Sequence, residues 1–173
     1  MFERKYDMVR VGTNVFGFWK SPLQLQRFSA INKNVSLLPV LTWKTKIIQV
    51  KEIPAGSYVG YNCSFYSDKQ RTIAVVPIGY VDGYPRGLSN KGFMVVRGVQ
   101  VSVIGIVSMN LTIIDVSSVA NVANGDEVIV MGAYEGVSIP RTAEILGTIS
   151  NELATRLSPE IPRIIIESTV ESS

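Results

Sequence analysis

The 173-residue chain contains no histidine and a single cysteine, Cys63. Zinc and other transition-metal sites are built mainly from histidine and cysteine, so this composition offers no ligand set for such a centre. One cysteine also cannot form an intramolecular disulfide. We therefore expect neither a metal nor an internal disulfide to hold the fold together.

Long apolar runs and concentrated charge are also scarce. A membrane-spanning helix needs about 18 consecutive apolar residues, and no such run occurs; nor does a signal-peptide pattern follow Met1. The formal net charge is only +3, and the most basic stretch, Lys44 to Lys51, has the alternation of a solvated strand face. We expect a soluble, cytoplasmic protein with neither a membrane nor a nucleic-acid partner.

The residues that are present favour one globular, mainly β domain. The chain is 46% hydrophobic and 18% charged, as in proteins with a packed core. Short apolar runs separated by glycine and proline predict a barrel or sandwich, and Arg97-Gly98 and Asn124-Gly125 predict tight turns. The expected strands lie within residues 37–57, 59–66, 72–80, 93–96, 99–107, 109–115, 127–131 and 163–167, with short helices within residues 138–157.

The densest cluster of reactive side chains follows one of these strands. Residues 73–78 form an apolar run typical of a strand covered on both faces, and glycine and proline then force a sharp turn. This turn carries Tyr80, Asp82, Tyr84 and Arg86. A strand followed by a turn is common in β proteins, so the pattern by itself leaves a purely structural turn open.

The turn also carries a family resemblance. Residues 79–86 read Gly-Tyr-Val-Asp-Gly-Tyr-Pro-Arg and closely resemble the Gly-Tyr-Ala-Asp-Gly-Tyr-Pro-Arg signature of bacterial alanine racemases. Further matches follow in the family's order at residues 10–12, 105–110, 125–128, 147–152 and 156–163. The chain is therefore identified, by resemblance, as the C-terminal part of such an enzyme.

The resemblance implies two regions. Residues 1–35 would hold the last strand and the linker of an N-terminal (β/α)8 barrel, with the strand within residues 6–19. Residues 36–170 would form the mainly β, barrel-like C-terminal domain with its short helices. The family's Schiff-base lysine belongs to the barrel, and nothing in this sequence resembles that region, so we expect these 173 residues alone to be inactive.

The implied reaction is the interconversion of L-alanine and D-alanine by an isomerase that uses pyridoxal 5'-phosphate and supplies D-alanine for peptidoglycan. Tyr80 would be one of the two catalytic bases, and the missing lysine would be the other. Met109 would bind the substrate. In this family the β domain of one subunit closes the barrel of its partner, so a homodimer with shared active sites is expected.

Four residues are implied at the cofactor. Arg10 would face the pyridine nitrogen, while Gly12 and Thr13 would meet the phosphate, since the loops after the last strands of such barrels commonly hold one. Asn151 stands where the family often has a phosphate-binding tyrosine.

The sequence departs from the family pattern at two further positions. Ile106 replaces the usual arginine and Asn110 the usual aspartate. These departures leave Tyr80 unchanged but bear on the electrostatics of the cofactor and the substrate.

Two alternatives stay open. A serine racemase or a racemase of broader specificity would share these motifs. A non-catalytic β-barrel binding module, such as one for nucleic acid, is suggested by the sequence pI of about 9.0, but it would need a basic face with exposed aromatic side chains, and the sequence does not show this arrangement.

Overall fold

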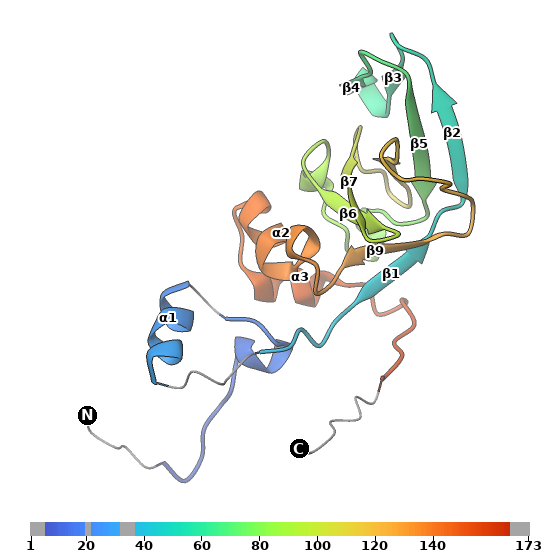
Figure 1. The fold of residues 1–173 in the computed structure, drawn as a ribbon. Coiled ribbons are helices and arrows are strands. Elements are labelled where there is room, and N and C mark those ends of the chain that lie inside the picture. Colours follow the sequence, from blue (N-terminus) through green and yellow to red (C-terminus); the bar gives the residue numbers. More distant parts are fainter. Residues whose placement is uncertain (1–5, 20–21, 32–36, 167–173) are drawn as a thin grey trace.

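A computed structural model describes residues 6–19, 22–31 and 37–166, and its main feature is a curled antiparallel sheet (Figure 1). The strands of this sheet are β1 (Trp43–Lys46), β2 (Gln49–Ile53), β5 (Arg71–Val76), β6 (Phe93–Val96), β7 (Val99–Val103), β8 (Thr112–Asp115) and β9 (Glu127–Met131). Their order is β1-β9-β6-β7-β8-β5-β2. A separate pair contains β3 (Tyr58–Val59) and β4 (Phe65–Tyr66).

One continuous segment, residues 43–53, forms both edges of the sheet. Its first half, β1, pairs with β9, and its second half, β2, pairs with β5. Between them the N–H of Ile47 donates to the carbonyl of Asp126 at 2.9 Å, and that of Ile48 donates to the carbonyl of Val75 at 2.9 Å. The two edges are thus joined as in a barrel, which confirms the mainly β, barrel-like fold.

The two turns expected from the sequence are present. Val96 pairs with Val99 across Arg97 and Gly98, whose φ angles are 49° and 78°. Positive φ at both central residues is the mark of a type I′ hairpin turn, which matches the twist of the flanking strands. Gly125, with φ of 90°, turns the chain into β9.

Both faces of β5 are covered. Ala74 and Val76 point into the main core, while Ile73 packs on the opposite face in a second apolar cluster with Ile53 and Ile104. Successive residues of a strand point to opposite faces, so a near-continuous apolar strand needs cover on both sides. The prediction for this strand is confirmed.

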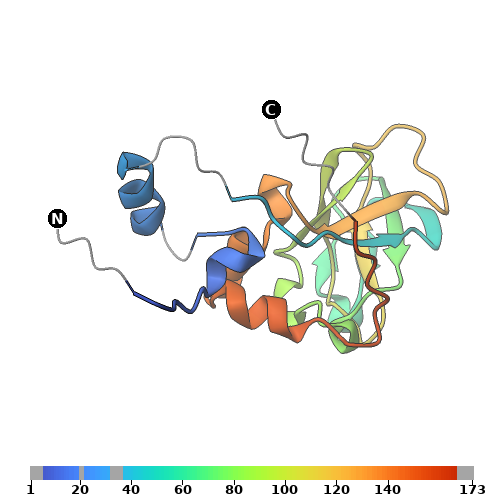
Figure 2. The same ribbon diagram turned by 90° about the horizontal axis from the view of Figure 1, so that it is seen from below.

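The helices are α1 (Pro22–Ile31), α2 (Ile139–Leu146) and α3 (Ser150–Arg156). Ser138 begins α2, because its hydroxyl accepts the N–H of Arg141, and Gly147 ends it with φ of 67°. α2 packs against α3 beside the sheet, whereas α1 lies apart from the sheet in both views (Figures 1 and 2). No helix in the described ranges is long and apolar enough to cross a membrane.

Two of the strands expected from the sequence are absent from the structure. Residues 6–12 are irregular and lead into a 3-10 turn, η1 (Thr13–Phe16). Residues 163–166 are also irregular, and Ile164, Ile165 and Ile166 are 86–92% exposed. A strand needs a neighbour for its N–H and C=O groups, and no described strand runs beside either segment. Residue 167, the last of that expected strand, lies outside the described residues.

Other expected strands are shorter than the sequence pattern. The run at residues 59–66 splits into β3 and β4 around a 3-10 turn, η2 (Tyr61–Cys63), where Asn62 and Cys63 have positive φ. Residues 104–111 form a loop between β7 and β8, although the apolar pattern extends the strands into it.

The region expected as a linker, residues 21–35, contains α1.

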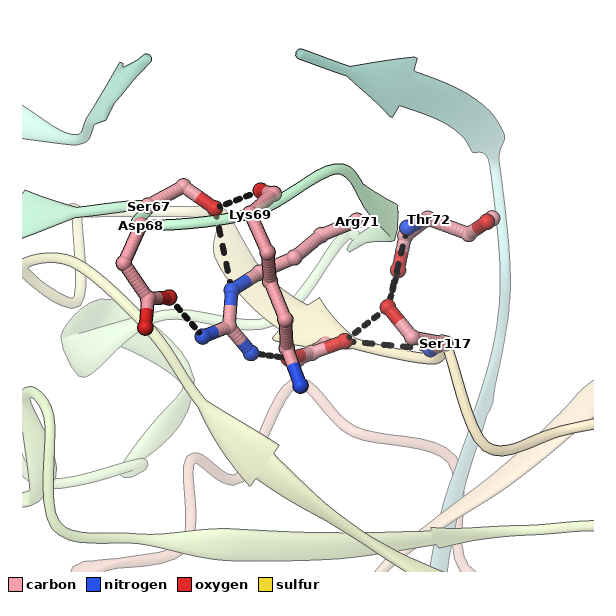
Figure 3. A network of polar contacts seen from close by, with 7 residues as sticks. Ser67, Asp68, Lys69, Arg71, Thr72 and Ser117 are labelled. Atoms are coloured by element: carbon pink, nitrogen blue, oxygen red, sulfur yellow. Dashed lines mark hydrogen bonds and ion pairs between the residues drawn. The ribbon is translucent and has the colours of Figure 1, made fainter. Parts of the chain in front are cut away.

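A polar network joins β5, β8 and the loop that precedes β5 (Figure 3). The guanidinium of Arg71 donates to Asp115 at 2.5 Å, to Asp68 at 2.9 Å and to Ser67 at 2.9 Å. The hydroxyl and N–H of Ser117 donate to the same carboxylate of Asp115 at 2.6 and 3.0 Å. Burial by itself would raise the pKa of Asp115, but these hydrogen bonds hold that pKa below its usual value.

This network predicts acid-sensitive stability. Because the folded-state pKa of Asp115 is depressed, its contribution is present above the unfolded-state pKa of about 3.9 and is lost as the pH falls through the folded value. Asp115→Asn should lower the free energy of unfolding at pH 7 by about 1–3 kcal/mol, as measured by denaturant titration, and the difference should shrink below about pH 4. Asp68→Asn, whose side chain is 74% exposed, is the matched control and should cost at most about 1 kcal/mol. A loss from Asp115→Asn that is independent of pH would contradict this account.

Candidate active site

The turn that carries Tyr80 is closed by its own backbone. It consists of the 3-10 turn η3 (Tyr80–Asp82), which follows β5. The carbonyl of Gly79 accepts the N–H groups of Asp82 and Tyr84 at 3.2 and 3.1 Å, and Gly83 ends the turn with φ of 101°. The side chain of Tyr80 is 44% exposed, so a phenol sits at the surface on a short, tightly hydrogen-bonded support.

This turn lies directly against the loop that carries Met109. The N–H of Tyr80 donates to the carbonyl of Ser108 at 3.1 Å, and that of Val81 donates to the carbonyl of Met109 at 3.0 Å. A Cβ atom at Gly79 would lie 2.2 Å from the carbonyl oxygen of Met109, so only glycine permits this approach. The structure thereby places Tyr80 and Met109 side by side.

Two side chains that sequence reasoning missed fix the Met109 loop. The hydroxyl of Ser89 accepts the N–H of Val107 at 3.0 Å, and the side-chain oxygen of Asn90 accepts the N–H of Gly105 at 2.6 Å. These contacts join positions 15 and 18 residues apart. No local sequence signal marks them, because serine and asparagine are common in any loop.

The other predicted residues meet at a second location. The hydroxyl of Thr13 donates to the side-chain oxygen of Asn151 at 3.2 Å, although the two residues are 138 positions apart. Both line a cavity of about 870 Å³ whose aromatic wall includes Phe16, Phe18 and Trp19. No atom lies within 4 Å of the position a Cβ would take at Gly12, which leaves the backbone there open.

Arg10 is exposed, and no hydrogen bond or ion pair to it is found within the described residues. The structure thus brings Gly12, Thr13 and Asn151 to one place, with Arg10 nearby in sequence but free of them. Arg10 does not line the cavity; among the described residues that do, the one cation is Arg141, which is paired with Glu144 at 2.5 Å.

The short helix α3 connects the two locations. Asn151 lies in its first turn, and at its other end the carbonyl of Arg156 approaches Gly83 so closely that a Cβ there would lie 2.4 Å from its oxygen. The N–H of Ser158 also donates to the carbonyl of Asp82 at 3.1 Å. Five residues of helix rise about 7.5 Å, so the Tyr80 turn and the Thr13–Asn151 pair lie at opposite ends of one helix.

Two other side chains of the turn have different roles. Tyr84 is 1% exposed and packs edge-on against Trp43, with ring centroids 6.3 Å apart, and burial raises the pKa of its phenol. Tyr84 is therefore a core residue. Arg86 is exposed at the start of the next 3-10 turn, η4 (Arg86–Leu88).

The two departures from the family pattern lie on the Met109 loop. Ile106 is half-buried, and its backbone N–H lies near Gly60, while Asn110 is exposed beside Met109. Asn110 therefore leaves this exposed position of the loop without the carboxylate that the resemblance led us to expect.

Comparison with a family model covers the Tyr80 turn, the Met109 loop and Asn151. The family model of the alanine racemase C-terminal domain matches residues 40–165. An alanine racemase of Desulfosudis oleivorans is 40% identical over 166 residues, covering 95% of this chain and 41% of that protein. One of Leptospira interrogans is 36% identical over 165 residues, covering 94% of this chain and 42% of that protein. The chain thus spans about two-fifths of the length of these curated relatives.

Solved structures agree with the sequence comparison. The alanine racemase of Clostridium difficile 630 in complex with cycloserine superposes with a TM-score of 0.77 at 29% identity, covering 87% of this chain and 38% of that one. The alanine racemase of Bartonella henselae with covalently bound pyridoxal phosphate superposes with a TM-score of 0.72 at 32% identity, covering 77% and 37%. Because the family model matches well over half of the residues of this chain, the chain belongs to the family of alanine racemase C-terminal domains.

Proposed function

We propose that this chain is the C-terminal domain of a pyridoxal-phosphate-dependent alanine racemase, in which Tyr80 is one of the two bases that interconvert L-alanine and D-alanine. The observation that carries the proposal is the exposed phenol of Tyr80 on a turn fixed by hydrogen bonds beside Met109. The relatives' names support alanine as the substrate. Since the chain spans about two-fifths of their length, catalysis also needs the remaining part, where the family's lysine lies.

Racemisation requires removal of the α-proton from one face of the amino acid and delivery of a proton to the other. Pyridoxal phosphate, when bound, acidifies that proton by drawing its electron pair into the pyridine ring. Tyr80 as the phenolate would take the α-proton of L-alanine on its oxygen, and as the phenol it would return one in the reverse direction. The rigid turn serves this role because proton transfer requires a fixed distance between base and substrate.

Met109 provides a contact for the substrate. Its carbonyl is used by Val81, but its own N–H has no hydrogen-bond partner in the described part of the chain, and its side chain is 53% exposed. An unpaired N–H on the loop that borders the Tyr80 turn can donate a hydrogen bond to the substrate carboxylate. This contact would orient the α-carbon toward Tyr80.

The residues at the other location fit the cofactor phosphate. Phosphate oxygens accept hydrogen bonds, and Thr13 and Asn151 supply a hydroxyl and an amide within 3.2 Å of each other. The open backbone of Gly12 allows close approach of an anion. Arg10 would face the pyridine nitrogen and, because its guanidinium stays charged, would keep that nitrogen unprotonated.

The proposal includes a homodimer in which Tyr80 and Met109 serve one active site while Arg10, Gly12 and Thr13 serve the other. The Tyr80 turn and Thr13 lie at opposite ends of α3, and this separation is compatible with the division. We further infer a cytoplasmic enzyme that supplies D-alanine for peptidoglycan.

The Tyr80→Phe substitution tests the base assignment in a hybrid enzyme, in which residues 6–166 of this chain replace the corresponding part of the Desulfosudis oleivorans relative. Exchange of the α-proton of L-alanine with deuterated solvent should fall by about 10²–10⁴-fold, because one acid–base group is lost. Exchange from D-alanine should fall much less. Both are measured by NMR, with absorbance reporting bound cofactor.

The matched control is Tyr61→Phe, since Tyr61 is 66% exposed on the η2 turn and should leave both exchange rates unchanged. Equal losses from the two enantiomers in Tyr80→Phe would show that Tyr80 supports the site without moving a proton. An unsubstituted hybrid that folds and binds the cofactor but exchanges only serine would favour a serine racemase over the proposed activity.

Asn151→Tyr tests the phosphate assignment. In the structure Asn151 accepts a hydrogen bond from the hydroxyl of Thr13, so removing the asparagine frees that donor, and the longer tyrosine adds another. A hydrogen bond to a charged group contributes about 1.5–3 kcal/mol, so pyridoxal phosphate should bind the apo hybrid roughly tenfold more tightly or better. Titration of the apo-enzyme measures this affinity. Unchanged or weaker binding would mean that Asn151 is either itself a ligand of the phosphate or not at the phosphate at all.

A further inference from the structure

We propose that Asp82 is a positioning residue for Tyr80: its carboxylate locks the backbone of the turn and so fixes the direction from which the phenol meets the substrate. The inference deepens the proposed function and rests on it.

The carboxylate of Asp82 closes the turn at its first residue. It accepts the N–H of Gly79 at 2.8 Å, while the N–H of Asp82 donates to the carbonyl of Gly79 at 3.2 Å. This reciprocal pair encloses Tyr80. Gly79 is buried, so water cannot replace the carboxylate freely, and loss of the acceptor would leave a buried N–H unsatisfied.

Asp82 also ties the turn to α3. Its carbonyl accepts the N–H of Ser158 at 3.1 Å, and the next residue, Gly83, lies against the carbonyl of Arg156. On the other side, the N–H groups of Tyr80 and Val81 are bound by the Met109 loop. The Met109 loop thus holds Tyr80 directly, whereas Asp82 links the same turn to the chain that follows α3.

The side chain of Asp82 acts as a hydrogen-bond acceptor. No ion pair to Asp82 is found among the residues that the structure describes, and the N–H of Gly79 is its only side-chain partner there. Asparagine offers an acceptor oxygen of the same geometry, whereas alanine offers none. Asp82→Asn should consequently preserve the lock that Asp82→Ala removes.

The first experiment measures proton exchange in the hybrid enzyme. Asp82→Ala should slow α-proton exchange from L-alanine by about 10–100-fold, because a displacement of the base on the order of 1 Å has that effect, and exchange from D-alanine by less than about threefold. Asp82→Asn should restore most of the L-alanine rate. Asp68→Ala, which removes an exposed carboxylate outside the turn, should leave both rates unchanged.

A double substitution tests whether Asp82 acts through Tyr80. If it does, Asp82→Ala should cause no further loss of L-alanine exchange in the Tyr80→Phe background, because the two residues form one functional unit. Losses that multiply would overturn the proposal.

The second experiment needs no activity and uses the 173-residue chain itself. Amide hydrogen exchange, followed by NMR, should show that Asp82→Ala lowers protection of the N–H groups of Gly79, Tyr80 and Val81 by about tenfold or more, while β7 is unaffected. Asp82→Asn should retain the protection. Unchanged protection in Asp82→Ala, or a uniform fall throughout the sheet, would overturn the proposal.

The outcomes separate the two levels of inference. If Tyr80→Phe fails to distinguish the enantiomers, the proposed role of Tyr80 is wrong. If Tyr80→Phe distinguishes them but Asp82→Ala slows both exchanges equally or neither, Tyr80 keeps its role and the positioning role of Asp82 is rejected.

Discussion

The contact between Gly79 and the Met109 loop is the constraint on which the candidate active site depends. The two backbones approach so closely that a single methyl group at Gly79 would overlap the carbonyls of Ser108 and Met109. This contact lets the amides of Tyr80 and Val81 reach those carbonyls. Only glycine fits at position 79, because any larger residue would push the two backbones apart and break the hydrogen bonds that fix Tyr80.

The curled sheet supplies the frame for this contact. β5 and β8 pair directly, with Val76 opposite Thr112, and the hydroxyl of Thr112 donates to the carbonyl of Ile78 at 2.6 Å inside the core. The Tyr80 turn leaves the end of β5, and the Met109 loop enters the start of β8. Neighbouring antiparallel strands thus bring the two segments to the same end of the sheet. The end of α3 contacts the turn at Asp82 and Gly83.

Sequence patterns anticipated those features whose causes are local. Two central residues with positive φ, as at Arg97 and Gly98, make a hairpin turn wherever strands flank them, and an apolar β-branched run makes a strand where neighbours exist. The Ile164–Ile166 run shows the limit, because its strand propensity is high but no described strand pairs with it. The proximity of Thr13 and Asn151 could be expected only through family resemblance, since no local rule relates residues so far apart. The position of Asp82, a carboxylate three residues after the first residue of a turn, is a sequence pattern that predicts a capping hydrogen bond. That spacing alone does not indicate that the bond positions Tyr80.

The segment that forms both edges of the sheet has a consequence for how the domain folds. β6 and β7 are joined by a two-residue turn and can pair as soon as both are present, whereas Trp43 must find Met131 near the far end of the domain. Pairings between distant parts of a chain are formed at a higher entropic cost and more slowly than local ones. We therefore expect closure of the sheet by β1 and β9 to be a late step of folding. Until it occurs, newly made chains expose unpaired strand edges, so the period before closure is when this domain is most open to aggregation.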